Sequence, residues 1–458
     1  MSAIDAYRAF LERRSNELEV FPIDGLDRLG VPVWSASAWD DTVSAHGAGY
    51  GQTEMQAERG ALGETVEGLA AALWASEARP RELLLKDARQ LGATEPRALS
   101  PVAGTSVADD QPLLWIEALT WPEGRSRLLP LEAVVTSVAE FAIAARDFPH
   151  LAPVFPPITN GLGAGDGEDL ARAVGHGLNE LLQRDLNWSQ FKALDTGRSV
   201  DAAAIWPEGV RRLAERGVAI RLKYSGHAFG VHAFHCSGVD AQATSLMRTA
   251  TGEGADADPA VAALKAMLEF CSSRCRKRFS FGGQEALAVA PHVYVGRFRT
   301  PAGQGAQELG IDLAARFDSL LSDPDAVAEV SDRITRVVEM VPLPPAYAPM
   351  RREAALAEAG HEILYVPMTE GGDEAQVAKV VVPGLEAEVL SHQRLGPRGI
   401  ERLAARCPHA VHEGPDSPGP GWTRAFGVWV HTKWLAELAS TFFPLYREPD
   451  RHAYEAPA

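Results

Sequence analysis

Apolar residues recur at helical spacing in three long segments of the chain. These segments are residues 53–77, 166–186 and 258–276, and each has apolar side chains on one face and a glutamate on the opposite face. Thr53 and Gln56 form a capping-box pattern at the start of the first segment. We therefore predict three amphipathic helices, each with its apolar face toward the core.

The two faces of each predicted helix carry different residue types. The apolar stripes are formed by Leu62, Val66, Leu69 and Leu73, by Leu170, Val174, Leu178 and Leu181, and by Leu264, Met267, Cys271 and Cys275. The carboxylate and amide residues away from these stripes are Glu64, Glu67, Glu180, Gln183 and Glu269. A glutamate face that is simply solvated is the plain alternative to a shared site.

Glycine-rich stretches precede all three predicted helices, at residues 49–51, 160–165 and 252–254. We predict that they are turns through which the chain enters each helix. Further glycines border the polar side of the first helix: Gly60, Gly63 and Gly68. Because each costs roughly 1 kcal/mol relative to alanine inside a helix, we expect something to approach this helix backbone closely.

Shorter elements complete the pattern. Strands are predicted at residues 31–34, 218–222, 229–236, 288–297, 363–367 and 377–382. Helices are predicted within residues 1–25, at 323–340 and at 396–405, with a glycine- and proline-rich loop at 414–421 and a C-terminal helix after it. Because strands and helices interleave, the predicted fold class is α/β or α+β. The predicted divisions are an N-terminal helical segment, a central catalytic region and a C-terminal helical extension, at residues 1–30, 31–390 and 391–458.

The charge balance argues against two classes of partner. With 61 Asp and Glu against 44 Lys and Arg, the net charge is −17, and such a surface repels nucleic acid and anionic lipid. No apolar run reaches the ~18 residues of a membrane span, and the N-terminus lacks the apolar segment of a signal peptide. Four cysteines without a disulfide pattern fit a reducing compartment, so we expect a cytoplasmic protein.

If the three acidic faces converge, their carboxylates repel one another. Two unit charges ~5 Å apart cost about 3 kcal/mol at an effective dielectric of ~20. A divalent cation would relieve this repulsion, and Mg²⁺ accepts oxygen ligands that include phosphate oxygens. The sequence has no Gly-x-x-x-x-Gly-Lys-Ser/Thr pattern of a P-loop. The acidic faces therefore favour a magnesium and nucleotide site assembled from distant segments.

These residues make the chain resemble the YcaO family, the ATP-dependent enzymes that modify peptide backbone amides. The positions that match the family's three motifs, in order, are Gly49, Gly51, Glu64 and Glu67, then Asn160, Gly161, Gly165, Glu180 and Arg184, then Gly252, Gly254, Glu269 and Arg274. Residues 380–385 resemble the family's late strand and turn. The resemblance covers about residues 30–390, and its specificity lies in the order of the motifs.

Five positions depart from the family pattern. Tyr50 stands where the family has lysine, Gly60 where it has serine and Gly68 where it has arginine. Gln183 stands where the family has glutamate, and Ser272 where it has glutamine. Tyrosine cannot supply a positive charge to a phosphate, and glutamine offers a metal an uncharged oxygen. A second interpretation therefore stays open, in which the chain is a non-catalytic subunit that binds the peptide or a partner enzyme.

The resemblance implies a composite α+β fold around a Mg–ATP cleft and an enzyme that phosphorylates a backbone amide of a ribosomally made precursor peptide. The product would be an azoline, a thioamide or an amidine, and no general base is identified. Mg²⁺ would be held by Glu64, Glu67, Glu180 and Gln183, and ATP by Tyr50, Gly51, Gly60, Asn160, Arg184, Glu269 and Arg274. A separate leader-binding or sulfur-transfer partner and a homodimeric assembly are also expected.

Two other groups of polar residues have metal-ligand chemistry. His227, His232, His235 and Cys236 would suit zinc, but their segment alternates like a strand, so the side chains divide between two faces. A loop cluster contains Cys407, His409 and His412. For both groups we favour a structural role.

Overall fold

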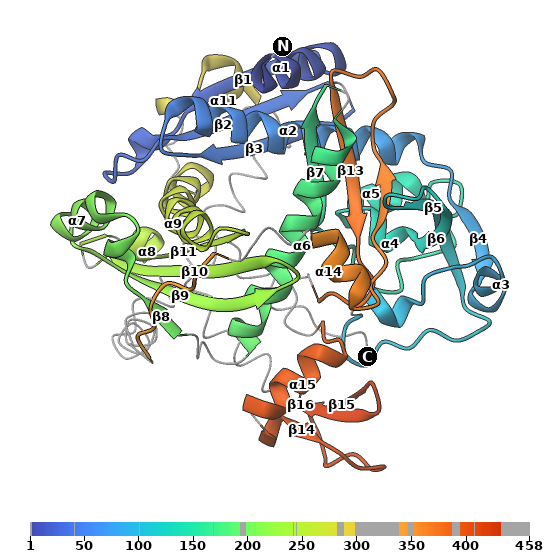
Figure 1. Ribbon diagram of the computed structural model, residues 1–458. Coiled ribbons are helices and arrows are strands. Elements are labelled where there is room, and N and C mark those ends of the chain that lie inside the picture. Colours follow the sequence, from blue (N-terminus) through green and yellow to red (C-terminus); the bar gives the residue numbers. More distant parts are fainter. Residues whose placement is uncertain are drawn as a thin grey trace.

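The computed structural model describes residues 2–40, 42–99, 101–167, 169–192, 198–240, 242–243, 245–281, 288–297, 339–346, 352–386, 394–406 and 408–431. In this part of the chain four sheets form, and every strand pair within them is antiparallel. Long helices pack against the sheets (Figure 1). The predicted mixture of helices and strands is confirmed as an α+β fold.

The first sheet has three strands in the order β1 (Glu17–Pro22), β2 (Val33–Trp39) and β3 (Ser44–Tyr50). The helix predicted within residues 1–25 is shorter, because α1 (Ala3–Arg14) ends before β1. Residues 17–22 pair with Trp34–Trp39 of β2 and therefore extend instead of continuing the helix. A short 3₁₀ turn, η1 (Asp24–Leu26), connects β1 to β2.

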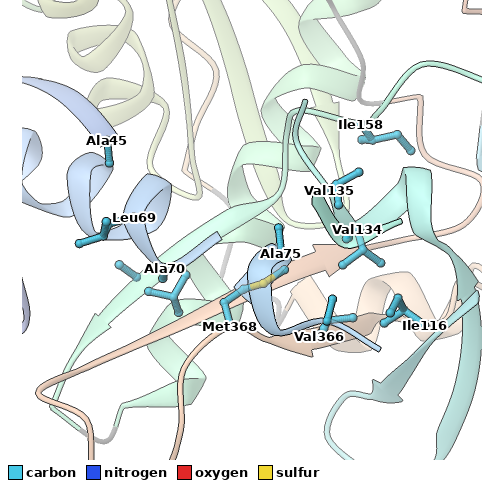
Figure 2. Packing of buried hydrophobic residues seen from close by; sticks show 14 of the residues in the cluster. Ala45, Leu69, Ala70, Ala75, Ile116, Val134, Val135, Ile158, Val366 and Met368 are labelled. Carbon is cyan, nitrogen blue, oxygen red and sulfur yellow. The ribbon is translucent and has the colours of Figure 1, made fainter. Parts of the chain in front are cut away.

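Helix α2 (Glu54–Glu77) follows β3 and begins as predicted, because Thr53 caps it and accepts a hydrogen bond from the Gln56 backbone N–H. Its predicted stripe is buried at Leu62, Val66 and Leu69. The helix packs between the first sheet and the second. Figure 2 shows this core, with residues of α2 beside residues of both sheets: Leu69, Ala70 and Ala75 against Ala45, Ile116, Val366 and Met368.

The second sheet has six strands. It runs β4-β5-β12-β13-β7, and β6 also pairs with β5. Its strands are β4 (Arg81–Leu84), β5 (Pro112–Thr120), β6 (Ser126–Pro130), β7 (Leu162–Asp166), β12 (Leu364–Pro367) and β13 (Ala375–Val381). Its associated helices are α3 (Leu85–Gln90), α4 (Leu131–Val134), α5 (Val138–Ala144), α6 (Leu170–Lys192) and α14 (Arg352–Glu358), with η2 at Pro96–Leu99. The predicted strands at 363–367 and 377–382 are confirmed as β12 and β13.

The third sheet has the order β11-β10-β9-β8. Its strands are β8 (Arg198–Val200), β9 (Val218–Ala228), β10 (Val231–Asp240) and β11 (Thr249–Asp256). The helices of this region are α7 (Pro207–Glu215), α8 (Ser245–Arg248) and α9 (Pro259–Phe281), with η3 at Ala202–Ala204. Helix α11 (His292–Arg297) lies beside the first sheet instead (Figure 1). Figure 1 shows α6 between this sheet and the β7–β13 pair, so α6 connects the second and third sheets.

The prediction of a strand at 288–297 is wrong, because His292–Arg297 form the helix α11. Tyr294 packs against Phe21, Trp39 and Phe279. Those contacts come from elements distant in the sequence, so the local apolar pattern could not reveal them.

The last described residues form a small separate lobe (Figure 1). It contains α15 (Pro397–Arg406), η4 (Pro408–Ala410), β14 (Val411–His412), β15 (Trp422–Ala425) and β16 (Val428–His431). The helix at 396–405 is confirmed as α15. A hairpin replaces the start of the predicted C-terminal helix, because Phe426 and Gly427 both adopt positive φ, as a tight hairpin turn requires. Residues 323–338 and 432–458, where the other two helices were predicted, lie outside the described residues.

No described helix is both long enough and apolar enough to span a membrane.

Candidate functional site

Three strand–helix units build the candidate site: β3–α2, β7–α6 and β11–α9. In each unit two glycines of the strand lie against the backbone of the helix that follows. A Cβ atom on any of them would come within 2.0–2.4 Å of a carbonyl oxygen in that helix or, for Gly165, of Asp169 just before it: Gly47, Gly49, Gly163, Gly165, Gly252 and Gly254. The glycines therefore allow strand and helix backbones to touch.

The prediction that these glycine stretches are turns is corrected here. Gly49 and Tyr50 end β3, residues 162–165 belong to β7, and residues 252–254 lie inside β11. Glycines two residues apart face the same side of a strand, and that side faces the helix. The same contact explains the glycine inside α2, because a Cβ on Gly60 would lie 3.1 Å from the Gly49 Cα. The close approach that we expected is therefore made by a strand.

Each unit holds one glutamate by a backbone hydrogen bond. The N–H of Ala48 donates to Glu64 Oε2 at 2.9 Å, and the N–H of Gly161 donates to Glu180 Oε2 at 2.8 Å. In the third unit the N–H of Glu253 donates to Glu269 Oε2 at 3.0 Å. The carboxylate on each helix is thus fixed by a segment at or next to the strand in front of that helix.

Glu67 connects the first unit to the second. Burial raises the pKa of Glu67 well above its usual value, the charges of Glu180 and Glu64 raise it further, and a backbone hydrogen bond from Ala164 of β7 opposes them. Its Oε1 atom is buried and receives no hydrogen bond, although His176 Nδ1 of α6 lies 3.4 Å away. Three of the predicted metal ligands therefore share one acidic region between α2 and α6.

The third unit joins the second through an ion pair. Arg184 of α6 reaches Glu253 of β11, with Nη1 to Oε2 at 3.0 Å, and lies 3.6 Å from Glu180 Oε1. Asn187 Nδ2 donates to the same Glu253 oxygen at 3.2 Å. The side chain of Arg184, a predicted ATP contact, is therefore shared by Glu180 of the second unit and Glu253 of the third.

Tyr50 joins the first unit to the third. Its hydroxyl donates to Glu269 Oε2 at 3.4 Å. Burial raises the pKa of Tyr50 well above 10.0, and the charges of Glu269 and Glu64 raise it further, while those of Arg276 and Arg184 oppose them. The phenol is therefore neutral at ordinary pH.

Two predicted nucleotide contacts have other partners. Arg274 is buried and points away from Glu269. Its Nε and Nη2 atoms pair with Asp27 and Asp240 at 2.7 and 2.8 Å, and its Nη1 donates to the Met247 carbonyl. Asn160 is also buried, and its backbone carbonyl accepts a hydrogen bond from Lys379. The structure gives Arg274 buried partners in the core instead of a place in the acidic region, and its role as a phosphate contact stays a prediction.

The remaining predicted positions lie beside the units. Gln183 follows Glu180 by one helical turn and is half-buried. Gly51 lies next to the side chain of Gln56 at the start of α2. Gly68 replaces the family's arginine. A Cβ added to it would lie 3.3 Å from the Cβ of Ala45. A side chain at position 68 would require Ala45 of β3 to give by a few tenths of an ångström.

Three neighbouring residues were not among the predicted site residues, although His176 was on the predicted polar face of its helix. His176 lies one turn before Glu180, Glu253 lies between two strand glycines, and Arg276 lies two turns after Glu269 on α9. Helical spacing was the available signal for His176 and Arg276. No local signal marked Glu253, because its partner Arg184 belongs to another unit.

The acidic region fits a divalent cation. The buried Oε1 of Glu67 has no hydrogen-bond donor, and the charges of Glu64 and Glu180 crowd this carboxylate. Within the described ranges, no three acidic, histidine or cysteine side chains are gathered tightly enough to form a metal site by themselves. Mg²⁺ commonly completes its shell with water and phosphate oxygens, so an incomplete set of protein ligands suits it.

The histidine-rich stretch of β9 and β10 does not form such a site. Tyr224 shares its hydroxyl between His232 Nδ1 at 3.0 Å and His227 Nδ1 at 3.4 Å, and Cys236 is buried in a hydrophobic cluster. Cys407 of the second group lies outside the described residues.

Comparison with known proteins gives one family. The model of the family described as YcaO cyclodehydratase, ATP- and Mg²⁺-binding, matches residues 48–386. No match was found among curated proteins.

Solved structures share the fold. The structure of YcaO from Methanopyrus kandleri bound with AMPPCP and Mg²⁺ is 19% identical, with a TM-score of 0.56 over 86% of this chain and 94% of that chain. A heterocyclase in complex with substrate and cofactor is 16% identical, with a TM-score of 0.57 over 84% of this chain and 52% of that chain. The E. coli microcin synthetase McbBCD complex with pro-MccB17 bound is 14% identical, with a TM-score of 0.52 over 80% and 87%.

Proposed function

Because the chain belongs to the YcaO family, whose cofactors are ATP and Mg²⁺, we propose that it activates a backbone amide of a peptide at the site between α2, α6 and α9. The observation that carries this proposal is the set of glutamates that three separate strand–helix units hold beside one another. Bound Mg–ATP supplies an electrophilic phosphoryl group for the amide oxygen.

The residues have separate parts in this proposal. Glu64, Glu67 and Glu180 hold the metal, and Gln183 adds an uncharged oxygen from the same helix as Glu180. The backbone N–H groups that bind Glu64 and Glu180 keep these carboxylates oriented before a ligand arrives. Arg184 contributes positive charge next to Glu180, while Glu253 holds its guanidinium in place.

A peptide is the proposed substrate, and an azoline, a thioamide or an amidine the proposed product. The likeness to a synthetase complex that binds pro-MccB17 supports a peptide substrate and a separate partner protein. We also propose a homodimer and a cytoplasmic location.

Replacing Glu67 tests the metal site. Burial and the charges of Glu180 and Glu64 disfavour the ionised form of Glu67, so Glu67→Gln should raise the melting temperature of the metal-free protein slightly, by ~1–2 °C. Calorimetric binding of a non-hydrolysable ATP analogue in the presence of Mg²⁺ should weaken at least about tenfold, because a ligand charge is lost. Glu58→Gln, on the same helix, is the control and should bind as wild type. Equal affinity for wild type and Glu67→Gln would remove Glu67 from the site.

A second candidate function is peptide or partner binding without turnover. The neutral Tyr50 at the lysine position and the uncharged Gln183 favour it. Phosphate release with Mg²⁺, ATP and the cognate precursor peptide separates the two functions. An enzyme releases phosphate when peptide is present, whereas a binding subunit releases none.

A further inference from the structure

Several basic side chains near the site are already paired. Arg184 is shared by Glu253 and Glu180, and Lys265 Nζ of α9 pairs with Asp256 at 2.8 Å. Arg274 forms buried ion pairs with Asp27 and Asp240, and position 50 holds a neutral tyrosine. The positive charge that the family's lysine would provide is therefore missing from its usual place.

Arg276 lies where it could replace that charge. It follows Glu269 by seven residues, which is two helical turns, so both side chains leave the same face of α9. Side chains of a helix lean toward its N-terminus, and Arg276 therefore leans toward Glu269. The Tyr50 hydroxyl contacts that same glutamate.

The charge of Arg276 acts on both residues, in agreement with its place on the same face of α9 as Glu269. Its charge opposes the rise in the pKa of Tyr50 and the rise in the pKa of Glu269, which burial causes in both cases. The side chain is half-buried and makes no hydrogen bond or ion pair among the described residues. Arg276 is thus a cation that pairs with no carboxylate of the described residues.

We propose that Arg276 binds the phosphates of ATP and supplies a positive charge that Tyr50, at the position where the family pattern has lysine, cannot supply. The inference rests on the proposed nucleotide site. An arginine suits this role because its planar guanidinium can donate two parallel hydrogen bonds to one phosphate, and its long side chain can reach in from the neighbouring helix.

Titration of a non-hydrolysable ATP analogue with Mg²⁺ into purified full-length protein tests the role of Arg276. Arg276→Gln and Arg276→Met both remove the charge, and the methionine keeps the apolar stem. Each should weaken binding roughly 10- to 100-fold, as expected for the loss of hydrogen bonds to a charged group. The affinity should also depend less steeply on salt, because one charge is lost. Arg211→Gln on α7, an exposed residue paired only with Glu215, is the control and should bind as wild type.

A double variant that moves the positive charge from position 276 to position 50 distinguishes phosphate binding from a structural role. Adding Tyr50→Lys to Arg276→Gln should recover at least about tenfold of the lost affinity, since the lysine returns a cation to its usual position. A folded, uncharged Arg276 variant that binds the analogue as tightly as wild type would overturn the inference while leaving the nucleotide site intact. A loss of affinity that Tyr50→Lys does not recover would also overturn it. Failure of the wild-type protein to bind the analogue would instead remove the proposed function and this inference together.

Discussion

At the residue scale, the contact that recurs is a hydrogen bond from a backbone N–H to a glutamate carboxylate. Glu64, Glu180 and Glu269 each accept one such bond. In Glu269 the bond from the Glu253 N–H favours the ionised form and so opposes the effect of burial on the pKa. For Glu269 burial is still the larger effect, and its pKa is raised. The acidic region therefore holds its negative charges at a cost that a bound cation would relieve.

A buried carboxyl outside the site makes stability depend on pH. Burial raises the pKa of Glu132 in α4 to about 7, although the Val154 N–H donates to its Oε1. Because the folded pKa exceeds the unfolded value of 4.5, the folded state binds the proton more tightly. This stabilisation is complete below pH ~4.5 and is lost as the pH rises through ~7, by about 3 kcal/mol.

Glu132→Gln should remove that part of the pH dependence. Glutamine resembles the protonated acid, so the melting temperature of the variant should fall less than that of wild type between pH ~4.5 and ~7. Thermal melts across this range measure the difference. Glu117→Gln, on an exposed position of β5, should keep the wild-type slope. Parallel slopes for wild type and Glu132→Gln would contradict the assignment.

At the scale of elements, the strand–helix unit is the repeated building block. Gly47, Gly49 and Glu64 have the same spacing as Gly252, Gly254 and Glu269, and the two sets make the same contacts. The strand glycines bring the strand close enough for its N–H groups to reach the helix glutamate. Close backbone packing and carboxylate orientation therefore depend on the same residues.

Gly49→Ala should separate strand from helix. Its Cβ would lie 2.0 Å from the Ala57 carbonyl oxygen, so β3 and α2 must move apart. We expect a loss of at least about 2 kcal/mol, as overpacking commonly costs. Chemical denaturation measures the loss. Gly25→Ala, which has no atom within 4 Å of its added Cβ, should change stability little. Similar stability for both variants would refute the close packing.

At the scale of the whole molecule, buried ion pairs hold the units together. Arg274 of α9 joins Asp27, just after η1, to Asp240 at the end of β10, and Arg28 adds a second bond to Asp240. On the other side, Arg184 and Glu253 join α6 to β11. The acidic region is thus enclosed by elements that are distant in the sequence.

Arg274→Met should destabilise the fold without changing the nucleotide site. It leaves Asp27 and Asp240 buried with less compensating charge, which we expect to cost about 3 kcal/mol. The affinity of the folded protein for the ATP analogue should stay within about twofold of wild type, because Arg274 does not face the site. Arg211→Met should lower stability little, since that residue is exposed. A selective loss of nucleotide binding at unchanged stability would return Arg274 to its predicted phosphate role.

The sequence by itself determined the features that depend on local chemistry. The Thr53 cap, the stripe of Leu62, Val66 and Leu69, and the β12 and β13 strands follow from capping and periodicity, and the order of the motifs identified the family. Tertiary structure decided the rest. The glycine stretches became strands because they pair with other strands.

The opposite roles of Arg274 and Arg276 also depended on tertiary structure. Both lie near the end of α9, and the motif spacing favoured Arg274. That side chain instead enters the core, because Asp27 and Asp240 approach α9 from elements far away in the sequence. Spacing along a helix tells which residues share a face, but only the neighbouring elements determine which face becomes the site.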